Sequence, residues 1–148
     1  MDRFVSGFIA GGVGGILKNI WSFLAFHVLG FGQLRFADWA SVIIFGRLAS
    51  STMEVVFSTL AYLIFVGILG IVFAYLIPAL SSRFYLFKGV IYGICLGLIF
   101  YSLPVLFKIP QLMRMDLNTV ISFWVGDIIW GLALGVTLKW LDQRAYLV

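Results

Sequence analysis

The apolar stretch from Phe4 to Phe31 constrains the fold of this chain more than any other segment, because one polar interruption, Lys18-Asn19, divides it. A helix needs about 20 apolar residues to cross the hydrocarbon core of a bilayer. The part on either side of the interruption is shorter than that. A helix that spans a membrane here must therefore carry Lys18 within it.

The composition identifies the solvent that surrounds such a helix. The chain is 63% hydrophobic and 11% charged, whereas an ordinary soluble domain is about half apolar and about a quarter charged. A soluble chain of 148 residues cannot bury so much apolar surface, so the excess must face a lipid bilayer. The net charge of +4 comes from ten Lys and Arg residues that are scattered singly. Nucleic acid is therefore excluded as a partner, because it requires a clustered basic face.

The apolar pattern predicts four membrane-spanning helices in one transmembrane domain, residues 1–148. The predicted spans cover residues 4–30, 52–77, 85–107 and 119–141. Residues 34–47 are too short to span, and they contain Trp39, a ring suited to headgroup depth. We expect a short interfacial or re-entrant helix there, or an ordered connecting loop that the tryptophan anchors. The predicted fold class is an all-α integral membrane protein, a four-transmembrane-helix antiparallel bundle with a short helix between the first two spans.

Local signals indicate where the helices begin and end. Ser51-Thr52-Met53-Glu54 matches a capping box, in which the serine bonds forward and the glutamate bonds back. Glu54 lies in the first turn of the second predicted span, a position that favours the capping role over a role as a functional carboxylate. Pro78 is expected to end the second span. Either Asp116 or Asn118 can cap the fourth.

The basic residues outside the spans favour one topology by a small margin. Five lie on the side of the N-terminus and four on the other: Arg3, Arg83, Lys88, Lys139 and Arg144 against Arg35, Arg47, Lys108 and Arg114. The positive-inside rule then places both termini in the cytoplasm. No cleavage site follows the first apolar region, so we expect the first helix to be retained rather than removed as a signal peptide.

Glycines recur at every fourth position in two of the spans. They are Gly7, Gly11 and Gly15 in the first span and Gly89, Gly93 and Gly97 in the third, and the fourth span adds Gly131 and Gly135. Residues four apart share a helix face, and small residues let membrane helices approach closely. We therefore expect these faces to contact other helices. The shared spacing also suggests that the first and second halves are parallel repeats, although glycines are common in membrane helices simply because they pack well.

Signals for catalysis and metal binding are nearly absent. His27 is the only histidine, which leaves no histidine pair for a metal and no choice of partners for a triad. Gly126-Asp127 resembles a fragment of the intramembrane aspartyl protease motif, but that chemistry needs two carboxylates that share a proton. No second carboxylate lies deep in any span. We therefore expect no enzyme, no metal and no cofactor.

The informative polar residues are Lys18, Asn19 and Asp127, which form the candidate binding site. Charges at membrane depth cost roughly 2.5–3.5 kcal/mol on insertion scales, so they usually have partners. If the first helix leaves the hydrocarbon near Phe26 and the fourth enters it near Thr119, Lys18 and Asp127 each lie about eight residues, or ~12 Å, below the same boundary. Opposite charges at one depth predict an ion pair inside the bundle. In the rival interpretation, Lys18 reaches the surface alone and Asp127 is protonated or beside water.

Several features, taken in order, resemble the uncharacterised YqhR-like membrane proteins of Gram-positive bacteria. They are a glycine-rich first helix, a Trp-containing segment before the second, and a glycine-spaced third helix. The best local similarity runs from Pro104 to Gly135, where a Pro-and-Phe break precedes Leu117-Asn118-Thr119-Val120-Ile121-Ser122 and then Ile129-Trp130-Gly131-Leu132-Ala133-Leu134-Gly135. The resemblance implies a multi-pass protein of the bacterial cell membrane and no known activity.

Two classes of function follow from these observations. In the first, the chain is a transporter-like or channel-like subunit, and the region around Lys18 and Asp127 lines a polar site or a proton path. Four helices leave little internal volume, so a pore would require a homo-oligomer or a larger membrane complex. In the second, the chain is a structural or accessory subunit, and the buried charges only fix how the helices pack.

Overall fold

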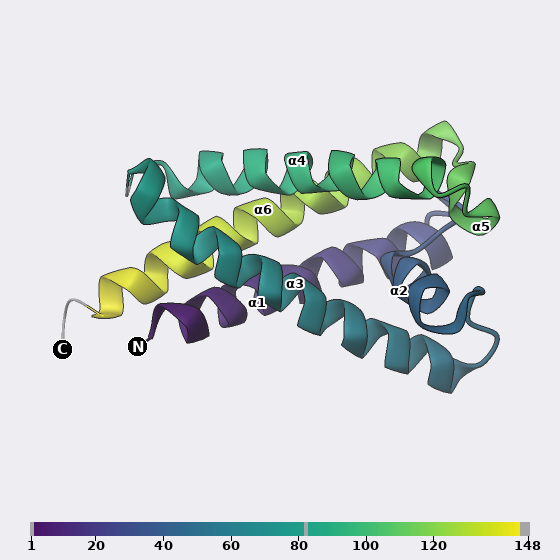
Figure 1. Ribbon diagram of the computed structural model, residues 1–148, viewed down its shortest axis with the longest axis horizontal. Coiled ribbons are helices and arrows are strands. Elements are labelled where there is room, and N and C mark those ends of the chain that lie inside the picture. The colour runs from purple at the N-terminus through teal and green to yellow at the C-terminus, as the bar shows by residue number, and fades with distance from the viewer. Residues whose placement is uncertain (1, 82, 146–148) are drawn as a thin grey trace.

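The computed structural model describes residues 2–81 and 83–145, and every regular element in this part of the chain is a helix. The elements are α1 (Arg3–His27), α2 (Phe36–Phe45), α3 (Thr52–Leu80), α4 (Tyr85–Leu106), α5 (Pro110–Met113) and α6 (Leu117–Ala145). Helices α1, α3, α4 and α6 are long and apolar enough to cross a membrane. They alternate in direction, so the start of α1 and the end of α6 lie together, with α2 and α5 at the opposite end (Figure 1). The predicted antiparallel four-helix membrane bundle is confirmed.

The four long helices are arranged in the order α3–α1–α6–α4. Helix α1 packs along both α3 and α6, and α4 packs along α6, whereas α3 and α4 meet at only a few points. The outward faces carry large exposed apolar side chains, among them Ile20, Leu60, Leu98 and Val136. Such a surface is suited to contact with lipid rather than water. The bundle is therefore closed along α1 and α6 and is least tightly packed between α3 and α4.

The caps of α3 and α6 largely follow the predictions. Ser51 Oγ accepts a hydrogen bond from the Glu54 N–H at 3.2 Å, as a capping serine should. The glutamate differs from a standard capping box, because its Oε2 accepts from the Ser50 N–H at 2.7 Å instead of from Ser51. At the start of α6, Asp116 Oδ1 accepts from the Thr119 N–H at 3.2 Å. Asp116 is thus the capping residue of α6.

The prediction that Pro78 ends the second span is wrong, because α3 continues through it to Leu80. Proline lacks the N–H that would bond to the carbonyl four residues earlier, which here belongs to Ala74. Arg3 Nη1 donates to this carbonyl oxygen at 3.1 Å. A side chain from α1 therefore replaces the missing backbone donor, and the helix can extend beyond the proline.

The eight glycines singled out in the sequence lie at helix–helix contacts. A Cβ added to Gly7 would lie 2.7 Å from the Ile71 Cα, and one added to Gly11 would lie 2.9 Å from the Gly70 Cα. Gly15 likewise faces α3, and Gly89, Gly93, Gly97, Gly131 and Gly135 lie where α4 meets α6. Real Cβ atoms essentially never approach other atoms within 3.0 Å. The helices can therefore approach this closely only at glycine. That this packing stabilises the bundle remains a prediction, and so does the internal repeat of the two halves.

Candidate functional site

Lys18 and Asp127 form an ion pair between the middle parts of α1 and α6. Lys18 Nζ donates to Asp127 Oδ1 at 2.5 Å, and the two side chains are 10% and 4% exposed. The predicted pair is confirmed, and the rival interpretation, in which Lys18 reaches the surface alone, is wrong. The ammonium group also lies 3.9 Å from the centre of the Phe36 ring, which α2 contributes. Such a cation–π contact adds to the attraction that holds the ammonium group in place.

A third helix completes this polar cluster. Tyr101 of α4 donates its hydroxyl to Asp127 Oδ2 at 2.5 Å. One helical turn earlier, Gly97 leaves room for the carboxylate, because a Cβ there would collide with Asp127 Oδ2. Both carboxylate oxygens therefore have a donor, one charged and one neutral. We call Lys18, Asp127 and Tyr101 the polar cluster.

Two tryptophans hold α1 and α6 together on either side of the polar cluster. Trp21 Nε1 on α1 donates to the carbonyl oxygen of Ser122 at 3.0 Å. Trp130 Nε1 on α6 donates to the carbonyl oxygen of Gly11 at 3.1 Å. Because each bond links a side chain to the backbone of the other helix, the relative position of α1 and α6 is fixed above and below the ion pair. The distance between Lys18 and Asp127 is therefore set by the packing of the helices as well as by their charges.

A cavity of about 400 Å³ lies between α3 and α4 and reaches the polar cluster. Apolar and aromatic side chains form most of its wall, and all three members of the polar cluster contribute to its lining. Three other lining residues, Ile43, Phe65 and Phe107, are 78%, 42% and 73% exposed. The cavity therefore reaches the outer surface of the bundle, on a side where the exposed side chains are apolar.

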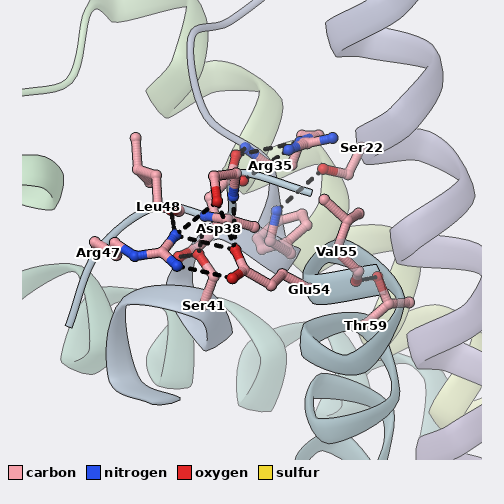
Figure 2. Close-up of polar contacts among 12 residues, drawn as sticks. Ser22, Arg35, Asp38, Ser41, Arg47, Leu48, Glu54, Val55 and Thr59 are labelled. Atoms are coloured by element: carbon pink, nitrogen blue, oxygen red, sulfur yellow. Dashed lines mark hydrogen bonds and ion pairs between the residues drawn. The ribbon is translucent and has the colours of Figure 1, made fainter. Parts of the chain in front are cut away.

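Helix α2 forms one wall of this cavity, and a network of polar contacts fixes its position (Figure 2). At its start, Ser22 Oγ on α1 accepts from the Phe36 N–H at 3.2 Å, and Arg35 Nη2 donates to Asp38 Oδ1 at 2.9 Å. Its end is a tight turn at Gly46, whose φ of 69° favours glycine. The predicted short helix in this segment is thus present, and it is tied to α1 at its beginning.

The loop after α2 is tied to α3 by a second set of contacts in the same view. Arg47 donates from Nη2 to Glu54 Oε1 at 2.7 Å and from Nη1 to Oε2 at 3.0 Å (Figure 2). These hydrogen bonds to Glu54 raise the pKa of Arg47, so its charge is secure. The carboxylate therefore organises the loop, in agreement with the structural role favoured for Glu54.

Asn19, the third predicted site residue, does not join the polar cluster. It is buried on α1, but its Oδ1 has no hydrogen-bond partner within the described residues, and it does not line the cavity. One position along a helix turns a side chain by about 100°, since 3.6 residues make a turn. Adjacent residues therefore face different neighbours, and Lys18 meets α6 while Asn19 does not reach the ion pair.

Sequence reasoning missed the aromatic partners of the site. Tyr101 and Phe36 contact the ion pair directly, and Tyr62 and Trp39 line the cavity beside it. One signal pointed to Tyr101, because it lies four residues after Gly97 and so continues the glycine face of its helix. No comparable signal marks the other three, whose positions depend on how α2 and α3 pack.

Comparisons of the chain with protein-family models, with curated proteins and with solved structures gave no match. In residues 2–81 and 83–145, no group of three or more His, Cys, Asp or Glu residues is placed to hold a metal ion. What can be inferred about function therefore depends on the cavity and on the polar cluster.

Proposed function

We propose that the protein is a transporter-like membrane subunit that binds a lipid-soluble molecule in the cavity between α3 and α4. The observation that carries this proposal is the cavity itself, which is about 400 Å³ in volume and mostly apolar, with a buried ion pair in its lining. Pockets of roughly 300–1,000 Å³ are the usual size for small-molecule sites, and a few polar groups in an apolar wall are typical of them. The exposed apolar residues at its opening would admit a molecule from the bilayer.

The polar cluster would orient the bound molecule in this proposal. Lys18, Asp127 and Tyr101 lie where α1, α4 and α6 meet, whereas the apolar opening lies among α2, α3 and the loop after α4. A molecule with an apolar body and a polar group would place the polar group at the cluster, because an unpaired polar group in an apolar environment costs free energy. Transport would then involve a homo-oligomer or a larger membrane complex, since four helices leave little room for a separate path.

A cavity-filling substitution tests the proposal. Ala61 lines the cavity, and its neighbour Leu60 faces outward and is 54% exposed. We expect Ala61→Trp to abolish saturable binding of tritiated 2-ethylnaphthalene to the protein in lipid nanodiscs, after subtraction of empty nanodiscs. Leu60→Trp adds a ring of the same kind outside the cavity and should bind as the parent does. Equal binding by the two variants would contradict the proposal.

A structural or accessory role is the second candidate, and one observation favours it. The ion pair is neutral overall, and its carboxylate already has two donors, so the polar cluster needs no ligand to satisfy it. A satisfied buried pair is an ordinary means of fixing how helices pack. Mass measurement of the complex purified in mild detergent separates the candidates. A larger membrane protein that purifies with the chain in fixed ratio, together with absent solute binding, would favour the accessory role.

A further inference from the structure

We propose that the molecule bound in the cavity is neutral, contains an aromatic or other planar ring, and presents a carbonyl-type oxygen as a hydrogen-bond acceptor. This inference rests on the proposed function, because it names the class of molecule that the cavity between α3 and α4 takes. Three features of the cavity carry it: its charge balance, its two unpartnered donors and its aromatic walls.

The charge balance favours a neutral molecule. Lys18 and Asp127 are the charged residues that line the cavity, and they neutralise each other at 2.5 Å. A charged ligand would leave one unbalanced charge in a poorly solvated site, or would have to separate the existing pair. Both are unfavourable at membrane depth.

Two buried donors in the lining have no partner. The hydroxyl of Tyr62 and Nε1 of Trp39 are inaccessible to solvent and make no hydrogen bond with any described residue. An indole N–H can only donate, and a phenol hydroxyl donates readily, so both call for an acceptor. The Tyr62 ring stacks on that of Phe36, with ring centres 5.9 Å apart, and Phe36 contacts Lys18, so Tyr62 lies near the polar cluster.

Other indole and phenol groups in the bundle show that such donors are normally satisfied here. Trp21 and Trp130 donate to backbone carbonyl oxygens, Tyr92 donates to the Leu69 carbonyl oxygen at 2.9 Å, and Tyr101 donates to Asp127. Unpaired buried donors are rare in folded proteins and need an explanation. An acceptor oxygen on a bound molecule would satisfy either donor once its side chain turns toward the cavity, because a carbonyl oxygen accepts from N–H and O–H groups alike.

The shape of the walls favours a flat ring. The lining includes Phe36, Phe65, Phe100 and Phe107 in addition to the two donor residues. Aromatic side chains pack well against other rings in stacked or edge-to-face arrangements. A saturated acyl chain would also be compatible with an apolar wall, but it would supply no acceptor at the depth of Tyr62. The cavity therefore suits a ring ketone, an aryl ketone or a compound of similar chemistry.

Three probes with the same ring system test the inference. They are 2-acetylnaphthalene, which carries a carbonyl oxygen, 2-ethylnaphthalene, which replaces it by hydrogen, and 2-naphthoate, which is charged. Saturable binding of the tritiated compounds is measured with the protein in lipid nanodiscs. We expect the ketone to bind about 2- to 10-fold more tightly than the hydrocarbon for each net hydrogen bond formed. The carboxylate should bind more weakly than either.

Variants of the two donors link any preference to the residues named. Tyr62→Phe and Trp39→Phe keep a ring and remove the donor, so each should lower the affinity for the ketone about 2- to 10-fold and leave the affinity for the hydrocarbon unchanged. Tyr75→Phe and Trp124→Phe are matched controls on exposed positions outside the cavity, and they should alter neither affinity.

The outcomes distinguish a failure of this inference from a failure of the proposed function. If ketone and hydrocarbon bind equally, or if the donor variants weaken both alike, the acceptor inference is wrong and the cavity remains a binding site for apolar molecules. Tighter binding of the carboxylate would overturn the inference of a neutral ligand. If none of the three probes binds saturably, the inference and the proposed function are both wrong.

Discussion

Removing either member of the Lys18–Asp127 pair should destabilise the bundle far more than removing both. The charged atoms are 2.5 Å apart and the side chains are 10% and 4% exposed, so water cannot replace a lost partner. An unpaired charge at membrane depth costs roughly 2.5–3.5 kcal/mol, and breaking a buried pair from one side costs roughly 3–5 kcal/mol. We therefore expect Lys18→Met and Asp127→Leu each to lower the free energy of unfolding by about 3 kcal/mol.

The two single variants should not be equal, because their surroundings differ. Without Lys18, the carboxylate of Asp127 keeps the hydroxyl of Tyr101 as a donor. Without Asp127, the ammonium of Lys18 keeps only the face of Phe36, and Tyr101 also loses its acceptor. Asp127→Leu should thus be the more damaging change. The double variant leaves only the tyrosine hydroxyl unpaired, so its loss should be about 1 kcal/mol.

Thermal unfolding in detergent measures these differences. For a chain of this size, 1 kcal/mol corresponds to about 2–4 °C in Tm, so the single variants should unfold about 6–12 °C below the parent and the double variant about 2–4 °C below it. Lys139→Met, on an exposed position of α6, is the control for loss of a lysine and should leave Tm within about 2 °C of the parent. If the loss in the double variant equals the sum of the single losses, the two residues do not stabilise each other and the reasoning is refuted.

Three further predictions concern packing, topology and the helix that continues through proline. Gly11→Leu should disrupt folding or assembly, as measured by size-exclusion chromatography. Gly12→Leu should not, because a Cβ on Gly12 has nothing within 4 Å. Equal profiles for the two variants would show that the glycine face of α1 is not a helix contact. In a background without the native cysteine, a membrane-impermeant reagent outside the cell should label a cysteine that replaces Arg47 and should not label one at the end of α6. The reverse pattern would show that the topology is the opposite of the predicted one. Arg3→Met should lower the free energy of unfolding by about 1–3 kcal/mol through the lost carbonyl contact, measured as a lower Tm. This loss should shrink in a Pro78→Ala background, where the backbone donor returns, and an undiminished loss would show that the contact does not matter.

The ion pair could be predicted from the sequence because depth along a membrane helix follows from counting residues. Each residue adds a fixed rise, so Lys18 and Asp127 come to one level whatever the arrangement of the helices. The partner of the second carboxylate oxygen could not be found in this way. Tyr101 reaches Asp127 only because α4 packs along α6, and the order of helices around a bundle does not follow from their hydropathy.

The end of α3 shows a different limit of sequence reasoning. Pro78 gives a strong local signal to stop, because it removes a backbone donor and crowds the preceding turn. The signal failed because a group distant in sequence, the Arg3 guanidinium, satisfies the freed carbonyl of Ala74. The unpaired donors of Tyr62 and Trp39 could not be predicted for the same reason, since pairing depends on which neighbours the fold supplies.

The position of the pair on the first and last spans has a consequence for how the protein is made. Lys18 enters the membrane early, and Asp127 follows it 109 residues later in the chain. At roughly 5–20 residues per second, α1 therefore waits about 5–20 s for its counter-charge. It is also the least apolar of the four spans, with a mean hydropathy of 1.3 against 1.7 to 2.6 for the others. In that interval its available neighbours are α2, whose Phe36 ring faces the ammonium group, and α3, which meets it through glycines. Neither places a carboxylate on Lys18, so a nascent chain that stalls before α6 holds a lysine without its counter-charge in the membrane.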